Sequence, residues 1–151
     1  MNKIIIGIDP DLTASGVALY RPDKSLELSC LNLPDLVRLF QEHKDHIEKV
    51  VIEAGWLIPK SNFHARQKQS VNSRESAAKN VGENHATGKH IECFARALGL
   101  NVQLLKPQGK KNHEQFCRIT GYQGRTTNPE KRDAGMLVFG MPFKTVGLGE
   151  G

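Results

Sequence analysis

The chain has 151 residues, of which 38% are hydrophobic and 14 are glycine, and its formal net charge is +5. This composition is that of one globular domain large enough to bury a core, and it excludes disorder, collagen and coiled coil for the whole chain. The apolar runs are too short to cross a bilayer, and Asp9 interrupts the first run too early for a signal peptide. Three scattered cysteines without a CxxC pair predict an intracellular, cytoplasmic protein with neither a disulfide framework nor a zinc site.

The charge is distributed unevenly along the chain. Residues 1–53 carry a net charge of −3, whereas residues 54–151 carry +8. A basic segment of this kind indicates a polyanionic partner, most often nucleic acid, although lysine-rich solvated surfaces have the same composition.

Three short strands are predicted near the N-terminus, over residues 3–9, 15–20 and 26–31. β-branched or alternating apolar residues form each run and turn residues separate the runs, so an antiparallel meander is expected. Pro34 and Asp35 begin a helix whose apolar positions extend to Ile47, and residues 50–53 form a fourth strand. The polar, basic stretch 56–73 has no period and is predicted to be a long loop.

A long helix is predicted over 74–98, because small and apolar residues recur there at steps of three and four. This stripe consists of Ala77, Val81, Asn84, Gly88, Ile91, Ala95 and Leu98. Its small residues suit close packing against a sheet or against a second copy of the chain. Gly82 and Gly88 each cost about 1 kcal/mol relative to alanine in a helix interior, which argues against an unbroken helix.

A fifth strand over 102–105 and helices over 112–119 and 129–138 complete the predicted elements. Their order predicts an α/β fold with a mixed sheet, and not a doubly wound one, because the opening strands lack crossover helices. A single domain is expected over 1–146, followed by a flexible glycine-rich tail at 147–151.

Carboxylates stand at positions that suit catalysis. Asp9 ends the first predicted strand, Glu53 ends the fourth, and Asp133 lies early in the last helix, one turn after Glu130. Each acid alone has an ordinary structural explanation, and Thr127 with Glu130 fits a capping box. If the first and fourth strands are neighbours, however, Asp9 and Glu53 converge, and the set predicts a catalytic site.

The N-terminal half then resembles a known family. Gly7-Ile8-Asp9-Pro10 followed by Ser15-Gly16 is similar to the opening hairpin of the RuvC family of Holliday-junction resolvases, within the ribonuclease H-like superfamily. Val51-Ile52-Glu53 matches the family's second acid, and Trp56 falls where such enzymes place an aromatic that acts at the junction.

The C-terminal half extends the resemblance to about Gly140. Arg132-Asp133-Ala134 resembles the family's C-terminal signature, with Glu130 in the place of a further acid, and the segment from Lys106-Pro107 to Lys110-Lys111 resembles its proline-then-lysine segment. The resemblance implies a ribonuclease H-like fold: a mixed five-stranded sheet with the antiparallel meander and helices on both faces. It also implies an endonuclease of DNA recombination and repair that cuts four-way junctions or other branched DNA.

The sequence departs from the family pattern at several points. Asp11 stands where the family usually has glycine, the stretch 120–130 is short, and the last helix is brief. These departures indicate a divergent member, with a phage-type enzyme as one interpretation.

The resemblance implies metal-dependent hydrolysis. Two Mg²⁺ ions per site, which Mn²⁺ can replace, would activate the attacking water and stabilise the leaving oxygen, and hard cations prefer carboxylate ligands. Asp9 would bridge both ions, Glu53 would bind one, and Asp133 with Glu130 would hold the other. Metal binding would relieve the repulsion among these acids and raise the melting temperature.

A second set of residues is predicted to contact DNA through phosphates and bases. It consists of Trp56, Lys60, Arg66, Lys68, Arg74, Lys110 and Lys111. The alternative for Trp56 is a core aromatic that anchors the loop, and His64, His85 and His113 are interpreted as surface or satisfied polar residues.

Other functions remain open at this point. An actin-like or sugar-kinase ATPase shares the opening strand, but 151 residues cannot hold its duplicated module, so no nucleotide cofactor is expected. A ribonuclease H-like nuclease acting on RNA/DNA hybrid or flap substrates, and a non-catalytic nucleic-acid-binding protein of the same fold, are the alternatives. Because a four-way junction has two-fold symmetry, paired incision predicts a homodimer.

Overall fold

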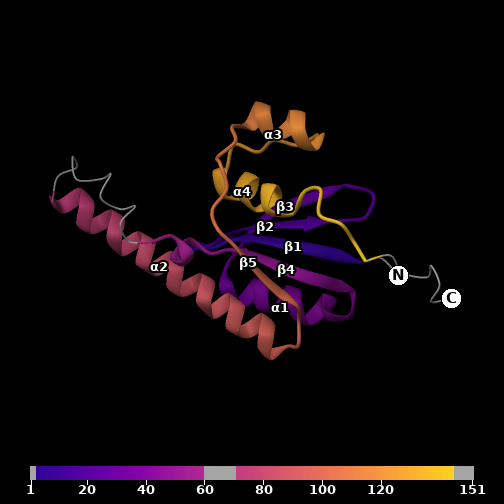
Figure 1. Cartoon of the computed structure of the whole chain (residues 1–151), viewed down its shortest axis with the longest axis horizontal. Helices are drawn as coiled ribbons and strands as arrows, with labels where there is room; N and C mark the ends of the chain where they lie inside the picture. Colours follow the sequence, from indigo (N-terminus) through magenta and orange to yellow (C-terminus); the bar gives the residue numbers. More distant parts are fainter. Residues whose placement is uncertain (1–2, 60–70, 145–151) are drawn as a thin grey trace.

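The computed structural model of the chain describes residues 3–59 and 71–144. Its single sheet contains β1 (Ile4–Asp9), β2 (Ser15–Tyr20), β3 (Leu26–Leu31), β4 (Ile47–Glu53) and β5 (Val102–Leu105). The strand order is β3-β2-β1-β4-β5, with antiparallel pairing among β1, β2 and β3 and parallel pairing of β1 with β4 and of β4 with β5. The predicted mixed five-stranded sheet with an N-terminal meander is confirmed (Figure 1).

Helices cover both faces of this sheet, as predicted. They are α1 (Leu33–His43), α2 (Val71–Ala97), α3 (His113–Thr120) and α4 (Pro129–Val138), with short 3-10 turns η1 (Lys44–His46) and η2 (Gly55–Leu57). α1 and α2 lie against one face and α4 lies against the other, while α3 stands beyond α4, away from the sheet (Figure 1).

The two sides of the core follow from strand geometry. Successive side chains in a strand point to opposite faces, so an uninterrupted run of isoleucines supplies both layers. Ile6 and its alternate neighbours pack with Phe40 of α1 and Ile91 of α2. Ile5, one residue away, packs instead with Val138 of α4.

Several boundaries differ from the prediction by a few residues, and the largest differences concern α1, β4 and α2. Ile47 was assigned to the first helix, but that helix ends at His43, η1 follows, and Ile47 begins β4. α2 begins at Val71, inside the predicted loop, and continues unbroken through Gly82 and Gly88. Packing of its C-terminal half against the sheet offsets the low helix propensity of glycine.

Two predicted segments cannot be compared, because residues 60–70 of the loop and the tail 147–151 lie outside the described residues. Within the described ranges, no helix is both long enough and apolar enough to cross a membrane.

Candidate metal centre

The carboxyl ends of β1 and β4 bring two acids together. These strands are parallel neighbours, and their register pairs Ile8 with Ile52, so Asp9 and Glu53 follow side by side at one edge of the sheet. Asp133 reaches the same point from α4. One oxygen from each of the three carboxylates lies within 4.8 Å of the other two. We call these three residues the acid cluster.

Two glycines allow α4 to lie close enough for Asp133 to join the acid cluster. A Cβ atom on Gly16 would overlap the backbone carbonyl of Glu130, and one on Gly7 would overlap the carbonyl of Ala134. The first turns of α4 therefore rest directly on β1 and β2, which explains why the glycines of the opening hairpin are needed.

The start of α4 corrects the explanation offered for Glu130. Asn128 is the N-cap, and its Oδ1 accepts a hydrogen bond of 3.0 Å from the backbone N–H of Lys131. The predicted capping box of Thr127 with Glu130 is therefore wrong, because Glu130 stands one position too early in the helix to cap it.

Glu130 is outside the acid cluster but lines a hollow beside it, together with Asp11, Asp9 and Asp133. The extra carboxylate, Asp11, has a local role. Its Oδ2 accepts hydrogen bonds from the backbone N–H groups of Thr13 at 3.0 Å and Ala14 at 3.3 Å. Asp11 thus shapes the turn that follows β1.

The three acids of the acid cluster perturb one another's ionisation. Burial raises the pKa of Asp9 from 3.8 to about 9, and the hydrogen bond and charge of Glu53 and then the charge of Asp133 act in the same direction. The side chains of Glu53 and Asp133 are only 9% and 12% exposed. Closely spaced, buried oxygen donors of this kind fit a hard divalent cation, which would favour the ionised form of each acid.

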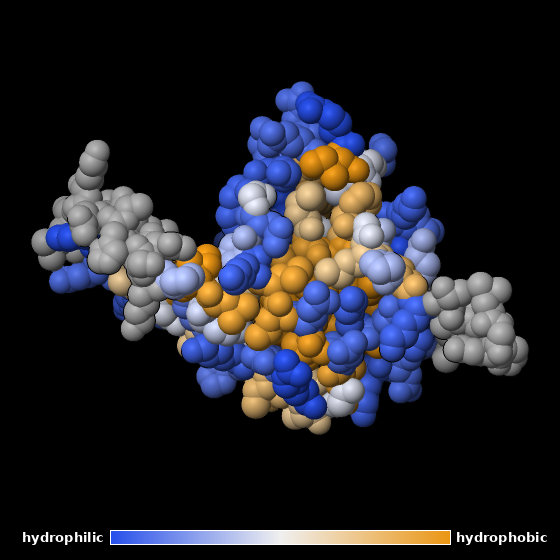
Figure 2. All heavy atoms as spheres, in the orientation of Figure 1, coloured by the Kyte–Doolittle hydropathy of each residue, from blue (hydrophilic) through white to orange (hydrophobic). Residues whose placement is uncertain are grey.

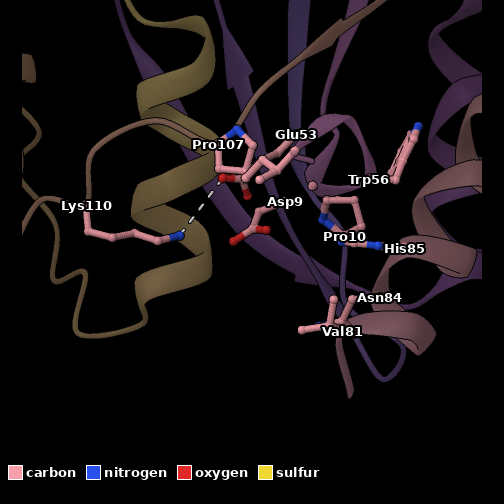
Figure 3. Close-up of a pocket in the computed structure, with 11 residues that line it drawn as sticks. Asp9, Pro10, Glu53, Trp56, Val81, Asn84, His85, Pro107 and Lys110 are labelled. Carbon is pink, nitrogen blue, oxygen red and sulfur yellow. Dashed lines mark ion pairs between the residues drawn. The ribbon is translucent and has the colours of Figure 1, made fainter. Parts of the chain in front are cut away.

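Among the described residues, Lys110 is the cation that pairs with these acids. Its Nζ donates to Oδ2 of Asp133 at 2.5 Å. The same Nζ lies 4.0 Å from Oε1 of Glu53, an ion pair drawn in Figure 3. Burial lowers the pKa of Lys110, but the bond to Asp133 and the charge of Glu53 outweigh it, so the pKa rises above 10.5. The side chain is nevertheless 67% exposed, so its ammonium group is accessible from solvent.

Trp56 lies in η2, directly after β4, and forms a wall of the cavity that contains Asp9 and Glu53 (Figure 3). Its ring packs on Gly88, where a Cβ would come within 2.6 Å of a ring carbon. It also makes an edge contact with His85, with 6.0 Å between ring centroids. Trp56 is therefore both packed against the core and adjacent to the acid cluster.

Sequence reasoning missed two residues of this cavity, Asn84 and His85. Oδ1 of Asn84 accepts a hydrogen bond of 3.0 Å from the backbone N–H of Leu12, which fixes the turn after Asp9. Burial, with the charge of Lys89, lowers the pKa of His85 and favours its neutral ring. A polar residue within the otherwise small and apolar stripe of α2 was the available signal for Asn84.

The remaining predicted DNA contacts are more scattered. Lys111 lines the hollow beside the acid cluster, whereas Arg74 is exposed near the start of α2 and lines neither cavity. Lys60, Arg66 and Lys68 lie outside the described residues.

Solved structures with a similar arrangement include two of RuvC from Thermus thermophilus. One, in complex with a Holliday junction substrate, has a TM-score of 0.53 at 14% identity, over 91% of this chain and 90% of that one. The other, described as the RuvC structure alone, has a TM-score of 0.52 at 14% identity, over 90% and 91%. The fold is RuvC-like.

This similarity confirms the predicted fold class. The RuvC-like fold spans nearly the whole of both chains, so the sheet and its flanking helices belong to one architecture. No family model and no curated protein sequence matches the chain.

Proposed function

We propose that this protein is a metal-dependent endonuclease that hydrolyses phosphodiester bonds in branched DNA, with the four-way (Holliday) junction as its substrate. The acid cluster at the sheet edge of a RuvC-like fold carries the proposal. A RuvC of this fold has been solved with a Holliday junction, which supports DNA as the partner. Action on DNA and three free cysteines agree with an intracellular site of action.

Asp9, Glu53 and Asp133 would hold the metal, with Glu130 as a further ligand on the side of the adjacent hollow. When bound, Mg²⁺ or Mn²⁺, in two ions per site, would supply Lewis-acid stabilisation of the phosphate and a more acidic water. Asp9 must lose its proton for this, because its pKa lies near 9 without a cation.

Other groups of the chain would act on the substrate. Lys110 would donate from Nζ to a phosphate oxygen and so stabilise the charge that develops there. In the reaction, a water molecule releases a proton as its oxygen bonds to phosphorus, the bond to the leaving sugar oxygen breaks, and that oxygen takes up a proton. Trp56 would stack on a base next to the cleaved bond, since its ring lines the same cavity.

The wider DNA surface would include Lys111, Arg74 and the basic residues Lys60, Arg66 and Lys68. Figure 2 shows hydrophilic side chains over much of α3, beside a smaller hydrophobic patch, and α3 follows the segment that carries Lys110. Neutralising Lys60, Arg66 and Lys68 together should flatten the dependence of DNA affinity on salt, because each phosphate contact releases counterions. An unchanged salt slope would place the DNA surface elsewhere.

A homodimer would suit this substrate, because a two-fold junction calls for two active sites related by the same axis. The stripe of α2 does not itself identify an interface. Ile91 and Ala95 pack inside the chain's own core, and Gly88 packs on Trp56. Sedimentation of the protein, free and on junction DNA, tests the dimer.

The experiment that tests the function compares substrates. Wild-type protein with Mg²⁺ is incubated with end-labelled four-way junction, flap, linear duplex and RNA/DNA hybrid. Preferential, paired cleavage of the junction supports the proposal. Preferential cleavage of the hybrid or flap would indicate the corresponding ribonuclease H-like or flap nuclease, and binding without cleavage under any metal would indicate a non-catalytic DNA-binding protein.

A further inference from the structure

Arg132 precedes Asp133 on α4, yet its bonds lead away from the acid cluster. Its Nε donates to the backbone carbonyl of Lys111 at 2.8 Å, and its Nη1 donates to the backbone carbonyl of Thr126. The two carbonyls belong to the irregular segments on either side of α3. One half-buried guanidinium therefore connects both segments to α4.

The second of these contacts continues into α3. Thr126 is 1% exposed, and its backbone N–H donates to Nδ1 of His113 at 3.2 Å. Its hydroxyl lies 2.7 Å from the same nitrogen. His113 is the first residue of α3, so Arg132, Thr126 and His113 form a continuous hydrogen-bonded chain between the two helices.

The first contact restricts the segment that carries Lys110. In the described part of the chain, the bond from Arg132 is the one hydrogen bond that connects the backbone of residues 106–111 to another element. It is made one residue after Lys110, whose ammonium lies on Asp133. Without this bond, a lysine that is 67% exposed on an irregular segment would sample many positions.

Arginine is suited to this task for a geometric reason. Its planar guanidinium presents several N–H donors in fixed directions, so one side chain can bond two separate carbonyls, and bonds from a charged donor are stronger than neutral ones. A lysine ammonium at position 132 would bring the charge without this fixed, two-directional geometry.

We propose that Arg132 is a positioning residue, which holds the 106–111 segment so that Lys110 stays at the acid cluster. The inference rests on the proposed function, since Lys110 is the group through which Arg132 acts. Replacing Arg132 should therefore lower the rate of the chemical step without weakening DNA binding.

A double-mutant cycle with Lys110 tests this coupling. With saturating Mg²⁺ and junction, Arg132→Ala should lower the single-turnover cleavage rate by about 10- to 100-fold and change the junction Kd by less than about threefold. In a Lys110→Ala background, Arg132→Ala should lower the cleavage rate by less than about twofold. The two effects are not additive because Arg132 acts through Lys110. Arg38→Ala, an exposed arginine of α1, is the control and should cleave at the wild-type rate.

Two further measurements separate positioning from folding. Guanidinium ion should restore cleavage to Arg132→Ala but not to the double variant, and Arg132→Lys should remain impaired. Hydrogen exchange of peptides 106–112 and 121–128 should be faster in both Arg132 variants, with exchange in the central strands unchanged.

Additive losses in the cycle, a wild-type cleavage rate in Arg132→Ala, or unchanged exchange in both segments would each overturn the proposal. If Arg132→Ala does not fold, Arg132→Lys is carried through the same cycle and exchange measurements. If wild-type protein cuts none of the DNA substrates, the proposed function fails, and the exchange measurement alone decides whether Arg132 holds the segment.

Discussion

Replacing Asp9 by asparagine should stabilise the metal-free protein while abolishing its response to metal. The pKa of Asp9 is raised from 3.8 to about 9, chiefly by burial and then by Glu53. Between these values the folded protein keeps a proton that the unfolded chain has released, so stability falls as the pH rises through this window. At pH 7 the pH lies about three units above the ordinary pKa of aspartate, and each unit corresponds to about 1.4 kcal/mol. The free energy of unfolding of the metal-free wild type is therefore lowered by up to about 4 kcal/mol.

In the Asp9→Asn variant the side chain at position 9 does not titrate, so the variant does not lose this stability. In EDTA at pH 7 its melting temperature should exceed that of the wild type by up to about 16 °C, since 1 kcal/mol shifts a domain of this size by about 2–4 °C. Mg²⁺ should raise the wild-type value and leave the variant unchanged. Asp45→Asn, at an exposed carboxylate of η1, should show no such gain.

Thermal unfolding of wild type and Asp9→Asn in EDTA, from pH 5 to pH 9, tests this prediction. The wild-type melting temperature should fall toward pH 9, and the difference between wild type and Asp9→Asn should widen over the same range. A variant less stable than wild type at pH 7, combined with a flat wild-type profile, would refute the electrostatic description of the acid cluster.

Four further changes test the packing around the site and the contact of Lys110 with DNA. Gly82→Ala should stabilise the protein by up to about 1 kcal/mol in urea unfolding, because among the described residues no atom outside its own stretch of helix lies within 4 Å of the added methyl, whereas Gly88→Ala should destabilise it by displacing Trp56. If Gly88→Ala were more stable than Gly82→Ala, α2 would not pack as described. Gly16→Ala should shift α4 and weaken Mg²⁺ binding measured by calorimetry, and an unaltered affinity would contradict the close approach of α4. Lys110→Gln should reduce the salt slope of junction binding by about one phosphate contact, and an unchanged slope would keep this lysine off the DNA.

Much of the fold was predictable because the local sequence patterns favour the same strands and helices that the structure contains. The strands at 15–20, 26–31 and 102–105 and the helix at 129–138 have the bounds expected from alternation and turn residues. The sequence placed Asp9 and Glu53 at the ends of apolar strands, and the parallel pairing of β1 with β4 in the structure is what brings them together.

What escaped prediction depends on contacts between distant segments. The propensity of Gly88 argues against a helix, but the ring of Trp56 occupies the space that a side chain would need. Asn128 caps α4 although Thr127 fits the capping pattern equally well, and only the chain path decides between them. No local pattern reveals that Arg132 bonds two carbonyls on either side of α3.

The central claim is that the acid cluster makes this protein a metal-dependent nuclease, and single-turnover cleavage of an end-labelled four-way junction tests it most directly. Wild-type protein should cleave at a rate that rises with Mg²⁺ to a plateau and disappears in EDTA. Asp9→Asn should lose at least about 1,000-fold in rate while binding the junction with unchanged affinity, since the basic surface remains. Cleavage by Asp9→Asn at the wild-type rate, or wild-type cleavage that persists in EDTA, would contradict the account.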